Sequence, residues 1–288
     1  MTLRQAITDA ANQLAADEHI RATSARDAEL LLLHLLQISR ANLFAYSERE
    51  LPADQQTAYQ SLVERRLQHE PIQYITGQQE FYGLNFHVTP AVLIPRPETE
   101  HLVEAVLKLL PSNHSLKIAD IGTGSGAIAI ALAAHLPQAE IIALDISLDA
   151  LAVASTNARE NNVADRIRFL QSDLLSAINE EEEFDAIVSN PPYIPEIDRD
   201  SLHPQVRDHE PVTALFAGET GLDIYRCLIP QSYKALKQNG LLALEIGYGQ
   251  QEAIVSLLQT WHNVSFVNDL QQIPRIALAQ KPASVAIR

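Results

Sequence analysis

The segment Asn190-Pro191-Pro192-Tyr193 has the residue types and the order to hold a planar –NH2 group by its two hydrogens. It follows an apolar run, residues 184–189, that is typical of a buried strand. Asn190 offers a side-chain carbonyl as acceptor, and Pro191 brings a carbonyl with no N–H beside it. The two prolines fix their own backbone φ angles, so the acceptors are held in place, and Tyr193 supplies a flat aromatic ring for packing. Taken alone, the segment is equally compatible with a turn started by Asn-Pro.

A glycine-rich turn is the second group of residues with chemical potential. Residues 118–121 lead into a run of five small residues, Gly122, Thr123, Gly124, Ser125 and Gly126. Small residues let a backbone and a helix N-terminus approach a ligand closely. The spacing is G-x-G-x-G and not G-x-G-x-x-G, so a dinucleotide pyrophosphate cradle is not the direct match. Alone, such a turn is often only a tight strand–helix connection.

Acidic residues follow the next two predicted strands. Asp145 ends residues 140–145, at the position where an acid accepts hydrogen bonds from ribose hydroxyls in doubly wound folds. Asp173 is placed to meet the exocyclic amine of an adenine, and Leu174 to pack on the base or donate its backbone N–H. Each acid alone is more often a helix cap. Together with Asn190 they predict one ligand site at the carboxyl edge of a sheet.

These residues must be positioned by an alternating pattern of strands and helices that begins near residue 99. Helix candidates cover residues 99–110, 127–136, 148–161 and 222–238; strand candidates cover residues 117–121, 140–145, 167–171, 184–189 and 240–246. This alternation predicts an α/β, doubly wound domain with a mostly parallel sheet and helices on both faces. Residues 264–268 and 275–280 predict an antiparallel pair that closes the sheet.

The front of the chain has a different pattern. Helix-period apolar residues recur from Leu3, from Asp27 and from Asp54, which predicts a small all-helical domain over residues 1–75. Residues 80–88 predict a short hairpin with Gly83 or Asn85 at its turn. The predicted division is therefore a helical domain, 1–75, a hairpin linker, 76–98, and an α/β domain, 99–288.

Composition and charge narrow the class of protein. The chain has 288 residues, 47% hydrophobic and 20% charged, which is ordinary for a globular protein. The single cysteine, Cys227, is predicted to be a buried helix residue, and its isolation fits the reducing cytoplasm. Neither a signal peptide nor a membrane span is indicated.

The net charge is −15. Residues 1–80 carry 7 Lys and Arg against 11 Asp and Glu, and residues 81–288 carry 14 against 25, so the acid excess is spread over the chain. No basic run is present, which argues against stable binding of long nucleic acid and is compatible with a basic protein partner. The acid run at residues 180–183 is predicted to be a solvated loop.

The site residues and several further segments resemble the release factor glutamine methyltransferases, the PrmC/HemK family. The resemblance covers essentially the whole chain and includes residues 71–77, 94–100, 207–211, 221–225 and 244–247. It implies a seven-stranded Rossmann-like methyltransferase domain and S-adenosyl-L-methionine as cofactor. At Leu174 this sequence departs from the family, where an aromatic residue is common.

The family resemblance also implies the reaction and its partner. The reaction is methyl transfer to the side-chain amide nitrogen of the glutamine in the Gly-Gly-Gln loop of peptide chain release factors. Asn190 Oδ1 and the Pro191 carbonyl would accept the two amide hydrogens, and the helical domain would recognise the partner. Arg96, Glu98 and Glu100 would shape the entrance to the site or simply begin a helix.

Other functions stay open at this point. The same corner serves adenine-N6 DNA methyltransferases, and a relative could methylate a glutamine of a ribosomal protein. A silent binding module is a third alternative, which the intact glycine turn and corner argue against. Ten histidines show no metal-ligand spacing, so we expect no metal and no nucleophilic triad. We expect a cytoplasmic monomer.

Overall fold

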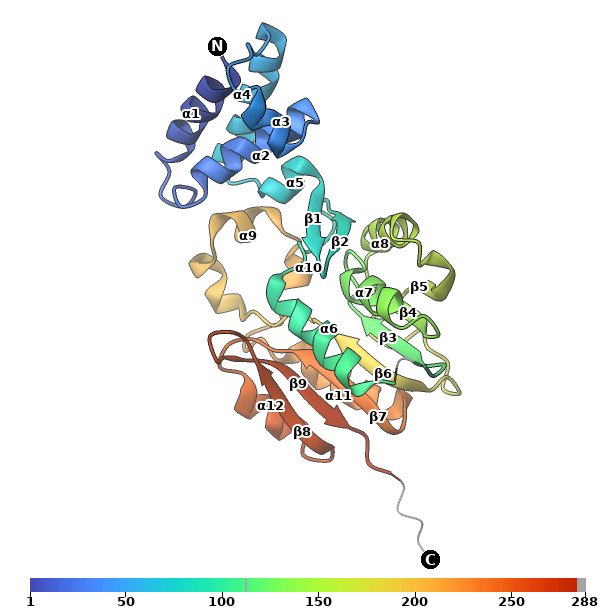
Figure 1. Cartoon of the computed structure of the whole chain (residues 1–288). Helices are drawn as coiled ribbons and strands as arrows, with labels where there is room; N and C mark the ends of the chain where they lie inside the picture. The colour runs from blue at the N-terminus through green and yellow to red at the C-terminus, as the bar shows by residue number, and fades with distance from the viewer. Residues whose placement is uncertain (112, 284–288) are drawn as a thin grey trace, which may run out of the picture. The chain divides into compact units, whose positions relative to one another are not determined.

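The structure is a computed structural model and describes residues 1–111 and 113–283. The chain forms two compact units (Figure 1). The smaller comprises Met1–Gln78 and Asp200–Glu210, and the larger comprises Gln79–Arg199 and Pro211–Arg288. The predicted three-part division at residues 75 and 98 stays a prediction. Residues 200–210, which that division assigns to the α/β domain, group here with the helices of the smaller unit.

The smaller unit is helical and packs around leucines. Its helices are α1 (Leu3–Leu14), α2 (Ser24–Leu36), α3 (Arg40–Ala45), α4 (Ala53–Leu67), α5 (Ile72–Thr76) and α9 (Pro204–His209). Thr2 and Gln5 form a capping box at the start of α1. A buried ion pair joins Arg66 Nε to Asp27 Oδ2 at 2.8 Å, and α5 ends at Gly77, whose φ of 75° stops the helix.

The predicted hairpin is present at the start of the larger unit. Strands β1 (Gln78–Phe81) and β2 (Leu84–His87) pair with each other. Tyr82 and Gly83 form the turn, with φ of 52° and 73°. Positive φ at both central residues is the type I′ geometry that matches the twist of the flanking strands.

The larger unit is built on a seven-stranded sheet in the order β5-β4-β3-β6-β7-β9-β8. Its strands are β3 (Lys117–Ile121), β4 (Glu140–Asp145), β5 (Ile167–Gln171), β6 (Phe184–Ser189), β7 (Leu236–Glu245), β8 (His262–Asn268) and β9 (Pro274–Gln280). Only β9, among these strands, runs antiparallel to its neighbours β7 and β8. The predicted mostly parallel sheet and its antiparallel closing pair are therefore confirmed.

Helices cover both faces of this sheet (Figure 1). Buried side chains of α6 (Pro97–Leu109), α7 (Ala127–His135) and α8 (Leu148–Glu160) pack on one face, and those of α11 (Asp223–Ala235) and α12 (Gln251–Leu257) on the other. Each face therefore has its own hydrophobic core. Successive residues of β3 point into different cores: Ile118 lies in the core with α6, α7 and α8, and Ala119 lies in the core with α11 and α12. The alternation of side chains along a strand, with a core on each face, thus explains why β3, β4 and β6 are largely apolar.

Some local predictions differ from the structure. Cys227 is exposed, because it lies beside Arg226 on the solvent side of α11, whose buried face is Tyr225, Leu228 and Ile229. Glu182 in the predicted solvated loop is partly buried and pairs with Lys117 and Arg168. Helix α12 and the short α10 (Val212–Leu215) were not predicted. None of the described helices is long and apolar enough to span a membrane.

Candidate active site

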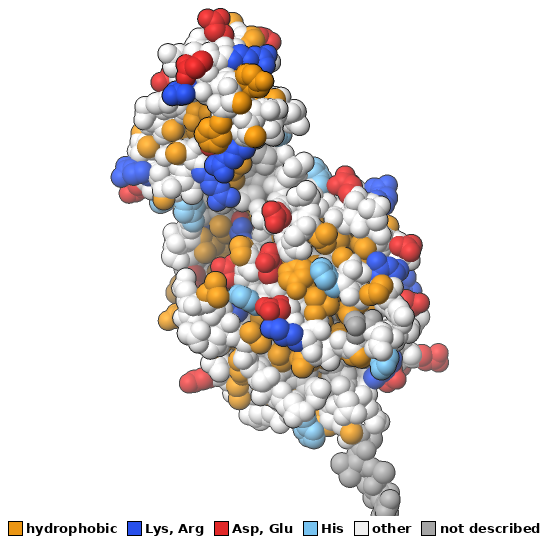
Figure 2. All heavy atoms as spheres, in the orientation of Figure 1, with side chains coloured by type: hydrophobic (Ala, Val, Ile, Leu, Met, Phe, Trp, Pro, Cys, Tyr) orange, Lys and Arg blue, Asp and Glu red, His pale blue; other side chains and the backbone are white. Residues whose placement is uncertain are grey.

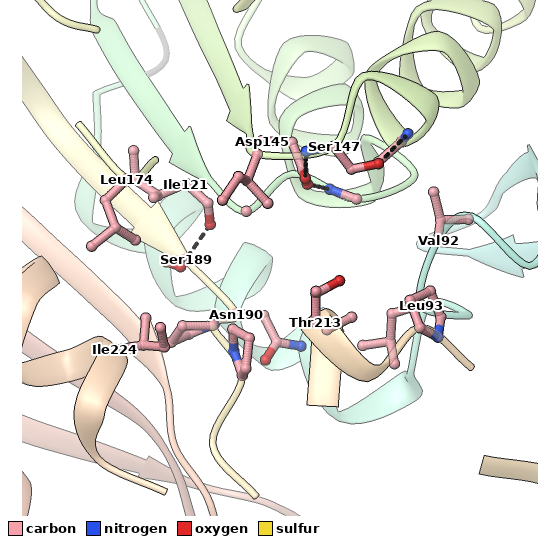
Figure 3. Close-up of a pocket in the computed structure, with 18 of the residues that line it drawn as sticks. Val92, Leu93, Ile121, Asp145, Ser147, Leu174, Ser189, Asn190, Thr213 and Ile224 are labelled. Atoms are coloured by element: carbon pink, nitrogen blue, oxygen red, sulfur yellow. Dashed lines mark hydrogen bonds between the residues drawn. The ribbon is translucent and has the colours of Figure 1, made fainter. Parts of the chain in front are cut away.

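The candidate site lies where the strand order reverses. The chain proceeds from β3 outward to β4 and β5, then returns to β6 on the other side of β3. Open α/β sheets bind ligands outside the carboxyl ends of their strands at this switch point. A cavity of about 340 Å³ occupies this position and is lined by Ile121, Asp145 and Asn190 from three adjacent strand ends (Figure 3). Its size falls within the range of small-molecule pockets.

The glycine turn after β3 divides into an open part and a packed part. Gly122 and Gly124 line the cavity with φ of 69° and 55°, and a Cβ built on either would meet nothing within 4 Å. Gly126 has φ of 83°, and a Cβ there would lie 2.9 Å from Ile130 Cδ1 and 3.1 Å from Ala154 Cβ. The first two glycines therefore leave room for a ligand, and the third allows the close packing of α7 on α8.

The other two residues of the turn are buried and structural. Thr123 Oγ1 donates to Asp120 Oδ2 at 2.7 Å, and the Ser125 carbonyl accepts from Asn157 Nδ2 at 2.8 Å. Asp120 also accepts from the Ala129 backbone at 3.2 Å through Oδ2. Burial raises the pKa of Asp120 to about 7, and its Oδ1 has no hydrogen-bond partner among the described residues. Thr123 and Ser125 thus shape the turn without being part of the cavity lining.

Asp145 is held rigidly at the end of β4. Its Oδ2 accepts from the Gly124 backbone at 2.8 Å, and its Oδ1 accepts from the Ser147 backbone at 2.9 Å (Figure 3). Burial raises the pKa of Asp145, whereas these backbone hydrogen bonds lower it. A carboxylate has about four acceptor positions, so Asp145 can accept further hydrogen bonds from the cavity side. Ser147 in turn caps α8 by accepting from Ala150.

The predicted adenine-facing residues also reach the cavity. Asp173 and Leu174 line it beyond the end of β5, where Asp173 is exposed. Leu174 has φ of 50°, a left-handed backbone conformation that is uncommon for a leucine. This conformation is a local backbone strain at a position that lines the cavity, and strained residues concentrate at functional sites.

The Asn-Pro-Pro corner ends β6 at the same cavity. Asn190, Pro191 and Pro192 all line it, and Ser189 Oγ just before them donates to the Ile121 carbonyl at 2.7 Å. That bond ties the end of β6 to the end of β3 (Figure 3). Asn190 Nδ2 donates to Thr99 Oγ1 at 3.0 Å. The corner is therefore anchored to the sheet and to the first turn of α6.

Tyr193 anchors the other end of the corner. Its carbonyl accepts from Gln250 Nε2 at 3.0 Å, and Gln250 Oε1 accepts from the Gly247 backbone at 2.9 Å. A Cβ at Gly221 would lie 2.2 Å from the Tyr193 carbonyl oxygen, so only glycine fits there. The Tyr193 hydroxyl donates to Glu245 Oε1 over a long 3.4 Å. Burial and the nearby Glu245 raise the pKa of this phenol, which keeps it protonated.

Known sequence families and curated relatives match this chain over most of its length. The PrmC N-terminal domain matches residues 5–77 and the Methyltransferase small domain matches residues 99–203. A release factor glutamine methyltransferase from Koribacter versatilis is 47% identical over 284 residues, 99% of this chain and 100% of the relative. One from Coxiella burnetii is 42% identical over 283 residues, 98% of this chain and 99% of the relative.

The chain belongs to the release factor glutamine methyltransferase family.

A solved methyltransferase has a similar fold. The T. thermophilus 16S rRNA N2 G1207 methyltransferase, in complex with AdoMet and guanosine, has a TM-score of 0.54 and 20% identity. The match covers 71% of this chain and 49% of that one. At this identity the likeness shows the fold alone, and it agrees with the methyltransferase architecture of the family.

In this member of the release factor glutamine methyltransferase family, most of the predicted site residues meet at one cavity. The cavity lining contains Gly122, Gly124, Asp145, Asp173, Leu174, Asn190, Pro191 and Pro192. Thr123, Ser125, Gly126 and Tyr193 support that lining from behind. Their roles in binding and catalysis stay predictions.

Sequence reasoning missed two segments that also line the cavity. They are Ala91, Val92 and Leu93 before α6, and Pro211, Thr213 and Phe216 in and around α10 (Figure 3). Both segments are short and irregular, so periodicity carried no signal for them. The adjacent family segments at residues 94–100 and 207–211 were the available indication. Among the described residues, no cluster of three or more His, Cys, Asp or Glu is arranged to hold a metal ion.

Proposed function

We propose that this protein transfers a methyl group from S-adenosyl-L-methionine to the side-chain amide nitrogen of the glutamine in the Gly-Gly-Gln motif of peptide chain release factors. Family membership supports the substrate class. The observation that carries the proposal is that Asn190, Pro191 and Pro192 of the corner line the same cavity as Asp145. The groups proposed to bind the amide and the nucleoside thus line the same cavity.

The cavity residues fit S-adenosyl-L-methionine. Gly122 and Gly124 leave open space at the end of β3, and Asp145 has unused acceptor positions for ribose hydroxyls. Asp173 would accept from the adenine amine, and Leu174 would pack against the base. When bound, the cofactor supplies an electrophilic methyl group on a positively charged sulfur.

The corner would hold the substrate amide. Its nitrogen is a poor nucleophile because the lone pair is delocalised into the carbonyl. Asn190 Oδ1 and the Pro191 carbonyl would accept the two N–H bonds and point the nitrogen at the methyl group. Acceptors in these positions favour a pyramidal nitrogen, so they stabilise the transition state more than the planar ground state.

Positioning would account for most of the rate. Among the described residues that line the cavity, the titratable side chains are Asp145 and Asp173. Asp145 is engaged by two backbone N–H groups, and Asp173 is exposed beyond β5. Neither is suited to be a general base at the corner. The nitrogen becomes acidic once it is alkylated, so its proton would pass to water after methyl transfer without a strong base.

We propose that the helical unit recognises the partner protein, since a glutamine in a protein loop needs contacts beyond one side chain. The acid excess is compatible with a basic partner surface, and basic side chains on the face shown in Figure 2 are interspersed with acidic ones. We also propose a monomer in the cytoplasm that forms no stable complex with nucleic acid.

The test is methyl transfer to three purified substrates in parallel: a release factor, ribosomal protein and duplex DNA. Labelled S-adenosyl-L-methionine should mark the release factor, and mass spectrometry should place one methyl group on the Gly-Gly-Gln glutamine. Label in DNA alone, or in the ribosomal protein alone, would contradict the proposal.

A further inference from the structure

Thr99 and Glu245 form a buried hydrogen-bonded relay behind Asn190. Asn190 Nδ2 lies 3.0 Å from Thr99 Oγ1, and Thr99 Oγ1 lies 2.6 Å from Glu245 Oε2. Thr99 and Glu245 are only 4% and 2% exposed. They come from the first turn of α6 and the last residue of β7, and neither lines the cavity.

The direction of this relay follows from the chemistry of a hydroxyl group. Thr99 has one O–H hydrogen, and the ionised Glu245 carboxylate can only accept. The hydrogen of Thr99 therefore points at Glu245, and Thr99 can only accept from Asn190. The Asn190 atom that faces Thr99 must then be the NH2 group. The relay thus distinguishes between the two flipped states of the Asn190 amide.

We propose that Thr99 and Glu245 are positioning residues that fix the amide flip of Asn190, leaving Oδ1 available to the substrate amide. This inference rests on the proposed function. In the opposite flip, the Asn190 NH2 would face the substrate NH2, and two donors would meet. The relay therefore acts through Asn190 on the substrate, and neither of its members touches the reacting atoms.

The surroundings of Glu245 make this relay sensitive to its charge. Tyr193 donates to its Oε1 from the corner, and the Tyr225 hydroxyl on α11 donates to its backbone carbonyl at 2.8 Å. Of the nearby charges, Glu98 on α6 raises its pKa and Arg275 on β9 lowers it, while burial is the largest effect and brings the pKa to about 7. A protonated Glu245 would donate to Thr99, whose own hydrogen would then point at Asn190 and favour the opposite amide flip, with Oδ1 facing Thr99.

Replacement of Thr99 tests the hydroxyl directly. Thr99→Val keeps the shape and removes the hydroxyl that accepts from Asn190 and donates to Glu245, so kcat for release factor methylation should fall about tenfold or more. The KM for the release factor and the Kd for S-adenosyl-L-methionine should stay within about twofold of wild type, because Thr99 does not line the cavity. Thr99→Ser keeps the hydroxyl and should restore kcat. Thr156→Val is the matched control. It removes a hydroxyl that bonds Ala152 and Arg159 within α8, so its kcat should equal that of wild type.

The pH profile separates positioning from a purely structural role. Wild-type kcat should fall as the pH drops through the pKa of Glu245. In Glu245→Gln, Tyr193 donates to the amide oxygen, so the amide NH2 faces Thr99 and donates to it. This variant should have a low kcat that is flat between about pH 6 and 8.5. Wild-type kcat in Thr99→Val, or an unchanged pH profile in Glu245→Gln, would overturn the relay.

A measurement without turnover keeps the relay distinct from the proposed function. The NMR side-chain amide signals of Asn190 should titrate with Glu245 in wild type and lose that titration in Thr99→Val. Persistence of the titration in Thr99→Val would overturn the relay even if methylation proceeds. Wild-type protein that leaves the release factor unmodified would instead overturn the proposed function, and the NMR signals would still decide the relay.

Discussion

Asn190 ends a buried strand with one half of its amide already engaged. Its Nδ2 donates to Thr99, and the neighbouring Ser189 hydroxyl donates to the Ile121 carbonyl, so the side chain is held before any substrate arrives. Preorganised acceptors need no rearrangement at the moment of reaction. The corner is therefore suited to select geometry and not to move protons.

Removal of the Asn190 acceptor should affect turnover far more than cofactor binding. Asn190→Ala removes Oδ1 and leaves the Asp145 and glycine-turn contacts in place. We expect kcat to fall by about 100-fold or more, with the Kd for S-adenosyl-L-methionine changed by less than about threefold. Steady-state kinetics and calorimetry measure the two quantities, and equal losses in both would contradict the assignment.

Asp145 should show the reverse pattern. Asp145→Ala removes the acceptor proposed for the ribose and also releases the Gly124 and Ser147 backbone N–H groups. A hydrogen bond to a charged group contributes about 1.5–3 kcal/mol, so the Kd for the cofactor should rise by about 10- to 100-fold. Calorimetric titration checks this, and an unchanged Kd would show that the ribose binds elsewhere.

Residue types that carry chemistry were visible in the sequence because their spacing followed strand ends. Asp145 and Asn190 could be expected at one edge since parallel strands end together. The relay could not be predicted, because Thr99 and Glu245 are separated by 146 positions. Nothing in the local sequence around either residue indicates a hydrogen bond that forms only in the folded sheet.

At the scale of elements, strand positions were more predictable than short helices. The predicted bounds of β3, β4, β5 and β6 match the structure. Strands β3, β4 and β6 are largely buried and therefore read as nearly continuous apolar runs, whereas β5 is an edge strand with Arg168 and Gln171 exposed. Helices α9, α10 and α12 have six, four and seven residues. Helices of one or two turns show too little periodicity for detection, and tertiary contacts stabilise them.

Substitutions of two glycines in the turn after β3 should have different effects, one on stability and one on cofactor binding. Gly126→Ala would bring a Cβ within 3.1 Å of α7 and α8 side chains at φ of 83°, so it should lower the free energy of unfolding by about 1–3 kcal/mol. In Gly122→Ala the added Cβ meets no neighbour, so this variant should lose less stability. It should nevertheless bind the cofactor more weakly, because the Cβ would occupy the proposed cofactor space. Urea unfolding and calorimetry compare the two, and identical behaviour would contradict this division.

The strand β3 carries a pH dependence at Asp120. Because burial raises its pKa to about 7 from an ordinary 3.8, the folded protein holds a proton that the unfolded chain has released. The resulting stability is full below about pH 4 and is lost as the pH rises to about 7. Relative to wild type, Asp120→Asn should gain up to about 1.4 kcal/mol per pH unit across this window. Urea unfolding at several pH values tests this, and parallel curves would contradict it.

At the scale of the whole molecule, the chain divides into a helical unit, which we propose recognises the partner, and a methyltransferase unit. The methyltransferase unit contains every residue that lines the cavity. The helical unit exposes two aromatic side chains at and beside α3, Phe44 and Tyr46, each 65% exposed. Exposed aromatic residues are common anchors at protein interfaces.

These aromatic residues should contribute to recognition of the release factor. Phe44→Ala with Tyr46→Ala should raise the KM for the intact release factor by about tenfold, since two anchors of this kind contribute more than about 1.4 kcal/mol. The KM for a short Gly-Gly-Gln peptide should not change. Tyr248→Ala, an exposed tyrosine on the methyltransferase unit, is the control. An unchanged KM for the release factor would place recognition elsewhere.

The central claim is that the corner at Asn190 methylates a release factor glutamine. Its most direct test is mass spectrometry of the release factor after incubation with S-adenosyl-L-methionine and either wild-type protein or Asn190→Ala. We predict one added methyl group on the Gly-Gly-Gln glutamine with wild type and little or none with the variant. A glutamine that stays unmodified after incubation with folded wild-type protein and cofactor would contradict the claim, and so would full modification by Asn190→Ala.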